Sequence, residues 1–220
     1  MARNIFIVED HPVMRRGYSY LVDAELDLEI CGETGAARDA LKQIPEADPD
    51  LVIVDLTLEG MGGLELIKRL QDTRPELPVL VVSMHDESLY ADRALRAGAQ
   101  GYIMKSEVES TVVEAIRTIL DGGMYVSDAF STQILMQYTG ANHAEGASPL
   151  DQLSDRELEV FEYMGRGLTT RQIAEQLLLS PKTIDSYRAR IKDKLAIENN
   201  TELTRRAVLW VENQGGVVDE

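Results

Sequence analysis

The chain has 220 residues, of which 44% are hydrophobic and 27% are charged, a composition typical of a globular protein with one large or two ordinary domains. No apolar run approaches the roughly eighteen residues of a membrane-spanning helix, and the N-terminal residues lead directly into a strand-like run rather than a signal peptide. These features argue against membrane and secreted classes and predict a cytoplasmic protein. The single cysteine, Cys31, is expected to pack at the end of a strand.

The formal net charge of −16 argues against nucleic-acid binding by the chain as a whole, because a polyanion repels a polyanion. The charge is unevenly distributed, however. Residues 1–148 hold 12 basic and 25 acidic side chains, whereas residues 149–220 hold 10 and 13. Within the second part, the stripe from Ser180 to Lys194 carries five basic side chains against two acidic ones, so the local charge there suits DNA.

Short apolar runs alternate with amphipathic helical stretches through the first part of the chain. The predicted strands are residues 4–8, 28–30, 51–54, 79–82 and 101–104. Continuous apolar strands between helices predict a doubly wound α/β fold, with a five-stranded parallel sheet covered by helices on both faces. One more helix is predicted over residues 128–138, and the Gly-, Ala- and Ser-rich residues 139–152 predict a linker.

Beyond the linker, the pattern predicts helices only. Ser154 and Thr169 begin capping boxes, and Ser180 precedes a proline at the first position of another helix. Four helices with short connections, two of them around a brief turn at Leu179–Ser180, predict an all-α helix-turn-helix domain. The chain is therefore divided into residues 1–124, a helix and flexible linker over 125–148, and residues 149–220.

Polar side chains follow the predicted strands of the first domain. The residues just past the strand ends are Glu9, Asp10, Asp55, Ser83 and Lys105. Because ligands bind at the carboxyl edge of an open parallel sheet, we expect these side chains on one rim. Three clustered carboxylates repel one another unless a hard cation lies among them, and oxygen ligands suit magnesium. The amine of Lys105 suits a phosphoryl oxygen. Together these side chains predict a carboxylate nucleophile that accepts a phosphoryl group with the help of Mg2+.

Five motifs in order resemble a two-component response regulator of the NarL/FixJ class, in which a flavodoxin-like receiver domain precedes a LuxR-type helix-turn-helix. They are VEDHP (8–12), LVIVDLTLEGMGGLEL (51–66), VVSMHDE (81–87), AGAQGYIMKS (97–106) and the block over 153–195 that opens LSDRELEV. The resemblance implies a transcription regulator whose binding to promoter DNA is controlled by phosphorylation, with a sensor histidine kinase as the donor.

The resemblance also assigns roles in the receiver domain. Asp55 is the implied phosphoacceptor, and the implied metal ligands are Glu9, Asp10, Asp55 and the backbone carbonyl of Thr57. The implied switch and phosphate-binding residues are Ser83, Tyr102 and Lys105. Two positions of the receiver domain depart from the family pattern, because Glu59 and Ser106 stand where relatives often have proline. Among the histidines, His11 is expected to lead into a helix, and His85 and His143 are expected to be surface residues.

In the second domain, the implied recognition helix spans Pro181 to Leu195. The implied DNA-binding residues are Lys182, Thr183, Asp185, Ser186, Arg188, Ala189 and Arg190. Of these, Asp185, Ser186 and Ala189 are expected to face base edges, while Lys182, Arg188 and Arg190 meet phosphates or flank the groove. Paired half-sites predict a homodimer when the protein is phosphorylated, with contacts at Ala207, Val208 and Val211 and at the receiver surface around Tyr102.

Two alternatives compete with this interpretation, and a third possibility explains the acidity without changing the function. A haloacid-dehalogenase-like phosphatase also uses an aspartyl nucleophile at a strand end, but it would need a second aspartate where this chain has Thr57. The enzyme interpretation is therefore disfavoured. The overall acidity leaves open an adaptor that acts by protein contact without DNA. The same acidity, with only six lysines, also fits a high-salt cytosol.

Overall fold

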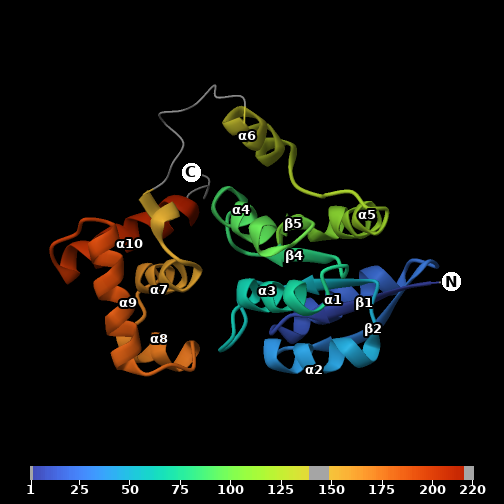
Figure 1. The fold of residues 1–220 in the computed structure, drawn as a ribbon, viewed down its shortest axis with the longest axis horizontal. Coiled ribbons are helices and arrows are strands. Elements are labelled where there is room, and N and C mark those ends of the chain that lie inside the picture. Colours follow the sequence, from blue (N-terminus) through green and yellow to red (C-terminus); the bar gives the residue numbers. More distant parts are fainter. Residues whose placement is uncertain (1, 139–148, 216–220) are drawn as a thin grey trace. The chain divides into compact units, whose positions relative to one another are not determined.

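The computed structural model describes residues 2–138 and 149–215 of the chain. It forms two compact units, Met1–Ala141 and Asn142–Glu220, which are described separately (Figure 1). The domain boundaries expected at residues 124 and 149 stay predictions. In the described residues, no helix combines the length and the apolar character needed to cross a bilayer.

The first unit is built on a five-stranded sheet in which every pair of neighbouring strands is parallel. The strands are β1 (Arg3–Val8), β2 (Leu28–Thr34), β3 (Leu51–Val54), β4 (Val79–Ser83) and β5 (Gly101–Met104), in the order β2-β1-β3-β4-β5. The helices are α1 (Pro12–Asp23), α2 (Ala37–Ala47), α3 (Gly63–Thr73), α4 (Glu87–Ala97), α5 (Val108–Leu120) and α6 (Asp128–Tyr138). The predicted doubly wound α/β fold is confirmed.

The sheet is covered on both faces because its central strands are apolar on both sides. Every residue of β3 and β4 is buried, whereas the edge strand β2 is partly exposed. Alternate residues of the strands pack with α1 and α5 in one cluster, which includes Ile5, Ile7, Leu51, Ile53, Leu80, Val82, Ile103, Tyr18, Val22, Val112 and Ile116. Helices α2, α3 and α4 lie side by side (Figure 1).

The sheet continues for one residue beyond β5. Tyr125 pairs with Gly101 in an isolated parallel bridge, accepts a hydrogen bond of 2.8 Å from the backbone N–H of Tyr102, and donates one of 3.0 Å to the carbonyl of Gln100. This bridge holds the segment that leads from α5 to α6 against the edge of the sheet. Helix α6 has the bounds predicted from the sequence.

The second unit contains the four predicted helices. They are α7 (Asp155–Gly165), α8 (Thr170–Gln176), α9 (Pro181–Lys194) and α10 (Asn200–Gly215). Both predicted capping boxes form, at Ser154 and at Thr169. The linker prediction fails at its end, because Pro149–Gln152 form a 3-10 helix that buries Leu150, while residues 139–148 lie outside the described residues.

Helix α7 anchors both α9 and α10. The buried Glu157 carboxylate lies 2.6 Å from Lys194 Nζ of α9, and it also accepts the backbone N–H of Ser154. Four residues further along α7, Phe161 contacts the ring of Trp210 of α10 at a centroid distance of 5.7 Å. These contacts hold α9 and α10 against α7 within the unit.

Candidate functional site

The predicted acidic residues meet at the carboxyl edge of the sheet, where β1 and β3 lie side by side. The backbone N–H of Asp55 donates to the carbonyl of Val8 at 2.9 Å, which brings the end of β3 beside the end of β1. Ligand atoms of Glu9, Asp10, His11 and Asp55 all lie within 4.8 Å of one another. The edge therefore holds an acidic cluster of the kind that suits a hard divalent cation. His11 was not predicted to belong to it.

Lys105 is the counter-charge of this cluster. Its Nζ lies 2.7 Å from Glu9 Oε2 and 2.9 Å from Asp55 Oδ2, and its side chain is only 5% exposed. The backbone N–H of Lys105 donates to the carbonyl of Ser83, so β4 fixes the strand end that carries the lysine. One ammonium faces two carboxylates that are almost fully buried, which leaves the site short of positive charge.

The shifted pKa of Asp55 follows from this shortage of positive charge. Burial, followed by the repulsion from Glu9, raises the pKa of Asp55 to about 6, against the opposing attraction of Lys105. Burial alone would lower the pKa of Lys105, but the two carboxylates outweigh it and the pKa is raised. Tyr18 lies behind the cluster and donates to Glu9 Oε2 at 3.4 Å. A cation or another positive group would relieve this repulsion.

A chain of hydrogen bonds leads from the Asp55 side chain through Thr57 and His85 to Ser83 and Tyr102. The backbone N–H of Thr57 donates to Asp55 Oδ1 at 3.1 Å, and Thr57 Oγ1 lies 2.9 Å from Nε2 of His85. The backbone N–H of His85 donates to Ser83 Oγ at 3.1 Å, and its carbonyl accepts the Tyr102 hydroxyl at 2.8 Å. Ser83 and Tyr102 are both buried. The structure therefore brings the predicted switch residues together, with His85 between them.

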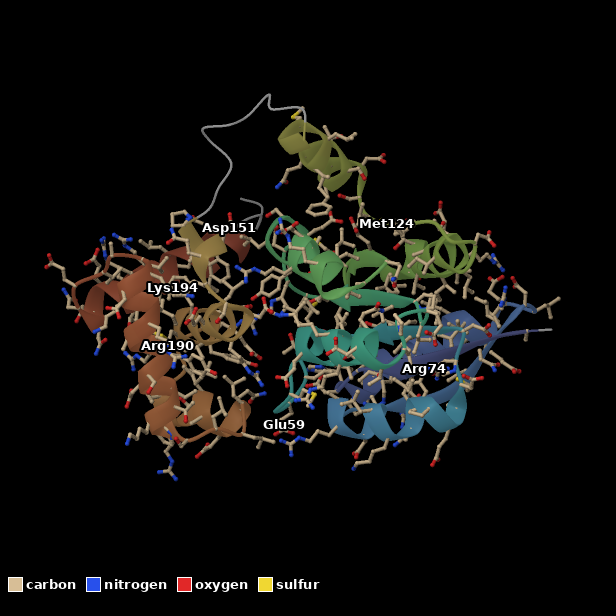
Figure 2. The ribbon with its side chains drawn as sticks, viewed as in Figure 1. Glu59, Arg74, Met124, Asp151, Arg190 and Lys194 are labelled. Atoms are coloured by element: carbon tan, nitrogen blue, oxygen red, sulfur yellow. The ribbon has the colours of Figure 1, made fainter. Side chains whose placement is uncertain are left out.

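The prediction that His85 is a surface residue was wrong. Its ring is buried, stacks on Tyr90 at a centroid distance of 4.3 Å, and bonds to the hydroxyl of Thr57. The sequence held a signal for this position, because His85 follows the strand-end Ser83 by two residues and therefore lies on the same rim. His143 falls outside the described residues. Glu59 is exposed in the loop between β3 and α3 (Figure 2).

Helix α9 presents most of the predicted DNA-binding residues to solvent. The exposed ones are Lys182, Asp185, Ser186, Ala189 and Arg190. Ser180 caps the helix by accepting the backbone N–H of Thr183 at 3.1 Å, and Thr183 itself is half-buried. The Arg190 guanidinium lies over the ring of Tyr187, 5.7 Å from its centroid. The exposed residues of α9 are therefore partly basic and include two carboxylates, Asp185 and Asp193.

Arg188 differs from its neighbours on α9. Its side chain is half-buried and donates to Oγ1 of Thr170 at 2.7 Å, so it connects α9 to the start of α8. Its role as a phosphate contact stays a prediction.

The structure corrects the proposed dimer contact at Ala207. This side chain is fully buried, and a Cβ added at Gly165 of α7 would lie 2.4 Å from the Ala207 carbonyl oxygen and 2.5 Å from Val211. Ala207 and Val211 therefore pack α10 onto α7 within the unit. Val208 and Val211 are half-buried, and Leu209 is the large apolar side chain of the described part of α10 that is most exposed.

Comparisons with known proteins agree with this arrangement. The family model described as response regulator receiver domain matches residues 5–117, and that described as bacterial regulatory proteins, luxR family, matches residues 151–207. The chain is 37% identical to the transcriptional activator protein ExaE of Pseudomonas putida over 93% of this chain and 95% of that protein. It is 31% identical to the response regulator UvrY of Escherichia coli K12, over 93% of both chains.

Solved structures show the same likeness. A LuxR-family response regulator from Aurantimonas is 32% identical, with a TM-score of 0.59 over 63% of this chain and 99% of that one. RcsB of Salmonella enterica, bound to promoter rprA with a phosphomimetic, has 22% identity and a TM-score of 0.66 over 94% and 99% of the two chains, which shows the fold alone. The chain therefore belongs to the two-component response regulators of the NarL/FixJ class, transcription regulators with a receiver domain and a LuxR-type DNA-binding domain.

Proposed function

We propose that Asp55 is the phosphoacceptor of this response regulator, and that its phosphorylation by a sensor histidine kinase controls binding of promoter DNA by α9 in the cytoplasm. The observation that carries the proposal is the Asp55 carboxylate, which is 1% exposed, shares the Lys105 ammonium with Glu9, and accepts a hydrogen bond from the backbone N–H of Thr57. A buried carboxylate held in this way is a positioned oxygen nucleophile.

The transfer would form a bond between phosphorus and an Asp55 carboxylate oxygen and break the bond between phosphorus and a ring nitrogen of the donor histidine. The donor imidazole then takes up a proton, and an acyl phosphate remains on Asp55. Lys105 is already 2.9 Å from Asp55 Oδ2 and can neutralise a phosphoryl oxygen. We expect the buried Ser83 hydroxyl to be a second donor to the phosphoryl oxygens.

Magnesium fits the donor set of this site. We propose that Glu9, Asp10, Asp55 and the backbone carbonyl of Thr57 hold it, because hard oxygen ligands suit this ion and the clustered carboxylates repel one another without a cation. When bound, Mg2+ supplies positive charge to the oxygens of the phosphoryl group. His11 lies at the rim of the same cluster, 2.6 Å from Asp10 Oδ1.

The proposed DNA contacts keep the division expected from the sequence. Lys182 and Arg190 would meet phosphates, with Arg188 and Thr183 beside them, and Asp185, Ser186 and Ala189 would face base edges. The exposure of most of these side chains on α9 supports the proposal. Paired half-sites favour a homodimer of the phosphorylated protein, for which Val208, Val211 and the face around Tyr102 are the proposed contacts.

Labelling with a small phosphodonor tests the phosphoacceptor. We expect magnesium-dependent labelling of the full chain that is lost in Asp55→Asn and kept in Asp72→Asn, a control at an exposed aspartate of α3. Labelling of Asp55→Asn at the wild-type level would refute the assignment.

Binding to a library of single-base operator changes at two salt concentrations tests the DNA contacts. Lys182→Ala should weaken binding to all sequences and flatten the salt dependence by about one unit of slope. Asp185→Ala should relax the preference at one base pair per half-site by about 1–3 kcal/mol. An unchanged preference at every position would contradict the role of Asp185.

A further inference from the structure

Helix α6 joins the first unit through a narrow attachment. Of the α6 side chains that the structure describes, residues 128–136, only Phe130 is buried, and Leu135 is 65% exposed. Figure 1 shows α6 standing apart from α5. Few buried side chains give a helix little packing energy of its own, so its stability depends on how its first turn is held.

The first turn of α6 is held by the first residue of α4. The backbone N–H of Ser127 donates to Oε1 of Glu87 at 2.9 Å, and the Ser127 hydroxyl donates to Oε2 of the same carboxylate. Ser127 in turn caps α6, because its Oγ accepts the N–H of Phe130 at 3.0 Å and its carbonyl accepts that of Ser131 at 2.9 Å. Glu87 is thus bound through two hydrogen bonds to the residue that starts the helix.

Glu87 is close in sequence to the residues around Asp55. It follows His85 by two positions, and His85 bonds to Thr57, Ser83 and Tyr102 in the set described above. The attachment is also continuous with β5, because the N–H of Tyr102 donates to the carbonyl of Tyr125. A rearrangement of the loop between β4 and α4 therefore acts on both contacts that hold the α6 segment, the one between Glu87 and Ser127 and the one between Tyr102 and Tyr125.

We propose that Glu87 is the residue through which the phosphoacceptor site controls helix α6, holding the helix in the unmodified protein and releasing it on phosphorylation. The proposal rests on the proposed function of Asp55. In the structure, Ser83 Oγ accepts the N–H of His85. If the Ser83 hydroxyl turns to donate to a phosphoryl oxygen, this contact is disturbed, the loop rearranges, and Glu87 leaves Ser127. Helix α6 precedes the DNA-binding unit, so its release changes the connection to that unit.

Hydrogen exchange of the full chain tests the proposal. In the unmodified protein, Glu87→Ala should make the amides of Phe130 and Ser131 exchange about tenfold faster, since hydrogen bonds to a charged acceptor are lost. The matched control is Glu109→Ala, which removes an exposed first-turn carboxylate from α5. It should leave α6 unchanged. Unchanged exchange in β3 of each variant shows that the sheet remains folded.

Hydrogen exchange of the phosphorylated protein is the second part of the test. Treatment of the wild type with a phosphodonor and magnesium should accelerate exchange in α6 to the level of Glu87→Ala, and it should add little further in that variant. Mass analysis of the same samples reports how much Asp55 is labelled. Missing label refutes the proposed function, whereas full label without faster exchange in α6 overturns the role of Glu87. Wild-type exchange in unmodified Glu87→Ala overturns it as well.

Discussion

The start of α3 leaves no room for a side chain at Gly63, and a methyl group there tests how tightly the Asp55 backbone is held. The Gly63 N–H donates to the carbonyl of Leu56 at 3.0 Å, which draws the helix onto the end of β3. A Cβ on Gly63 would lie 2.2 Å from the Asp55 carbonyl oxygen and 2.7 Å from Leu56 Cα. An ordinary C···O contact is about 3.3 Å, so a displacement of about 1 Å is required.

Neither the Asp55 backbone nor the start of α3 can move easily to relieve this contact. The Asp55 backbone is bonded to Val8 in the sheet, and Gly63 begins a helix whose first turn buries Leu64, Leu66 and Ile67. Overpacking of this kind costs about 1–3 kcal/mol, and a backbone-to-backbone clash belongs at the upper end. We therefore expect Gly63→Ala to destabilise the first unit by about 3 kcal/mol and to slow labelling of Asp55 by a phosphodonor.

Hydrogen exchange of the β3 amides measures this loss in the full chain. The control is Gly17→Ala in α1, because nothing lies within 4 Å of a Cβ at Gly17. Alanine is the better helix former, so this variant should be stabilised by about 0.5–1 kcal/mol. The steric argument fails if Gly63→Ala exchanges like the wild type, or if Gly17→Ala is destabilised to the same extent.

Three further predictions concern pH and backbone strain. Burial raises the pKa of Asp55 from 3.8 to about 6. The metal-free wild type should therefore lose stability relative to Asp55→Asn as pH rises from about 4 to 6. A difference in melting temperature between the two proteins that stays constant over this pH range would contradict this. Burial opposes ionisation of Glu157, but Lys194 and Ser154 lower its pKa, so this ion pair contributes stability above the usual glutamate range and loses it as pH falls. Lys194→Met should therefore cost about 1–2 kcal/mol at pH 7 and less in acid, as measured by urea unfolding. Leu178, exposed in the turn before α9, has a φ of 52°, so Leu178→Gly should gain about 0.5–1 kcal/mol in the same assay, and a loss would show that its side chain matters more than the strain.

The sequence alone determined the elements whose signals are local. The apolar run 51–54 is β3, residues 128–138 are α6, and the spacings at Ser154 and Thr169 form capping boxes. The acidic cluster was also predictable, because parallel strands bring their carboxyl ends to one edge and the residues just past each strand can be read directly. These features depend on short-range backbone geometry or on the parallel direction of the strands, and neither requires knowledge of distant partners.

Tertiary structure decided which surface each inward-facing residue meets. Periodicity marks one face of the last helix as apolar, but it cannot distinguish packing within the unit from packing against a second subunit, and Ala207 lies against α7. For the same reason the sequence predicts a surface position for His85, although its ring contacts Thr57 and stacks on Tyr90. A hydrogen bond between side chains far apart in sequence leaves no periodic trace in the chain, so such partners are fixed only when the sheet and its helices pack together.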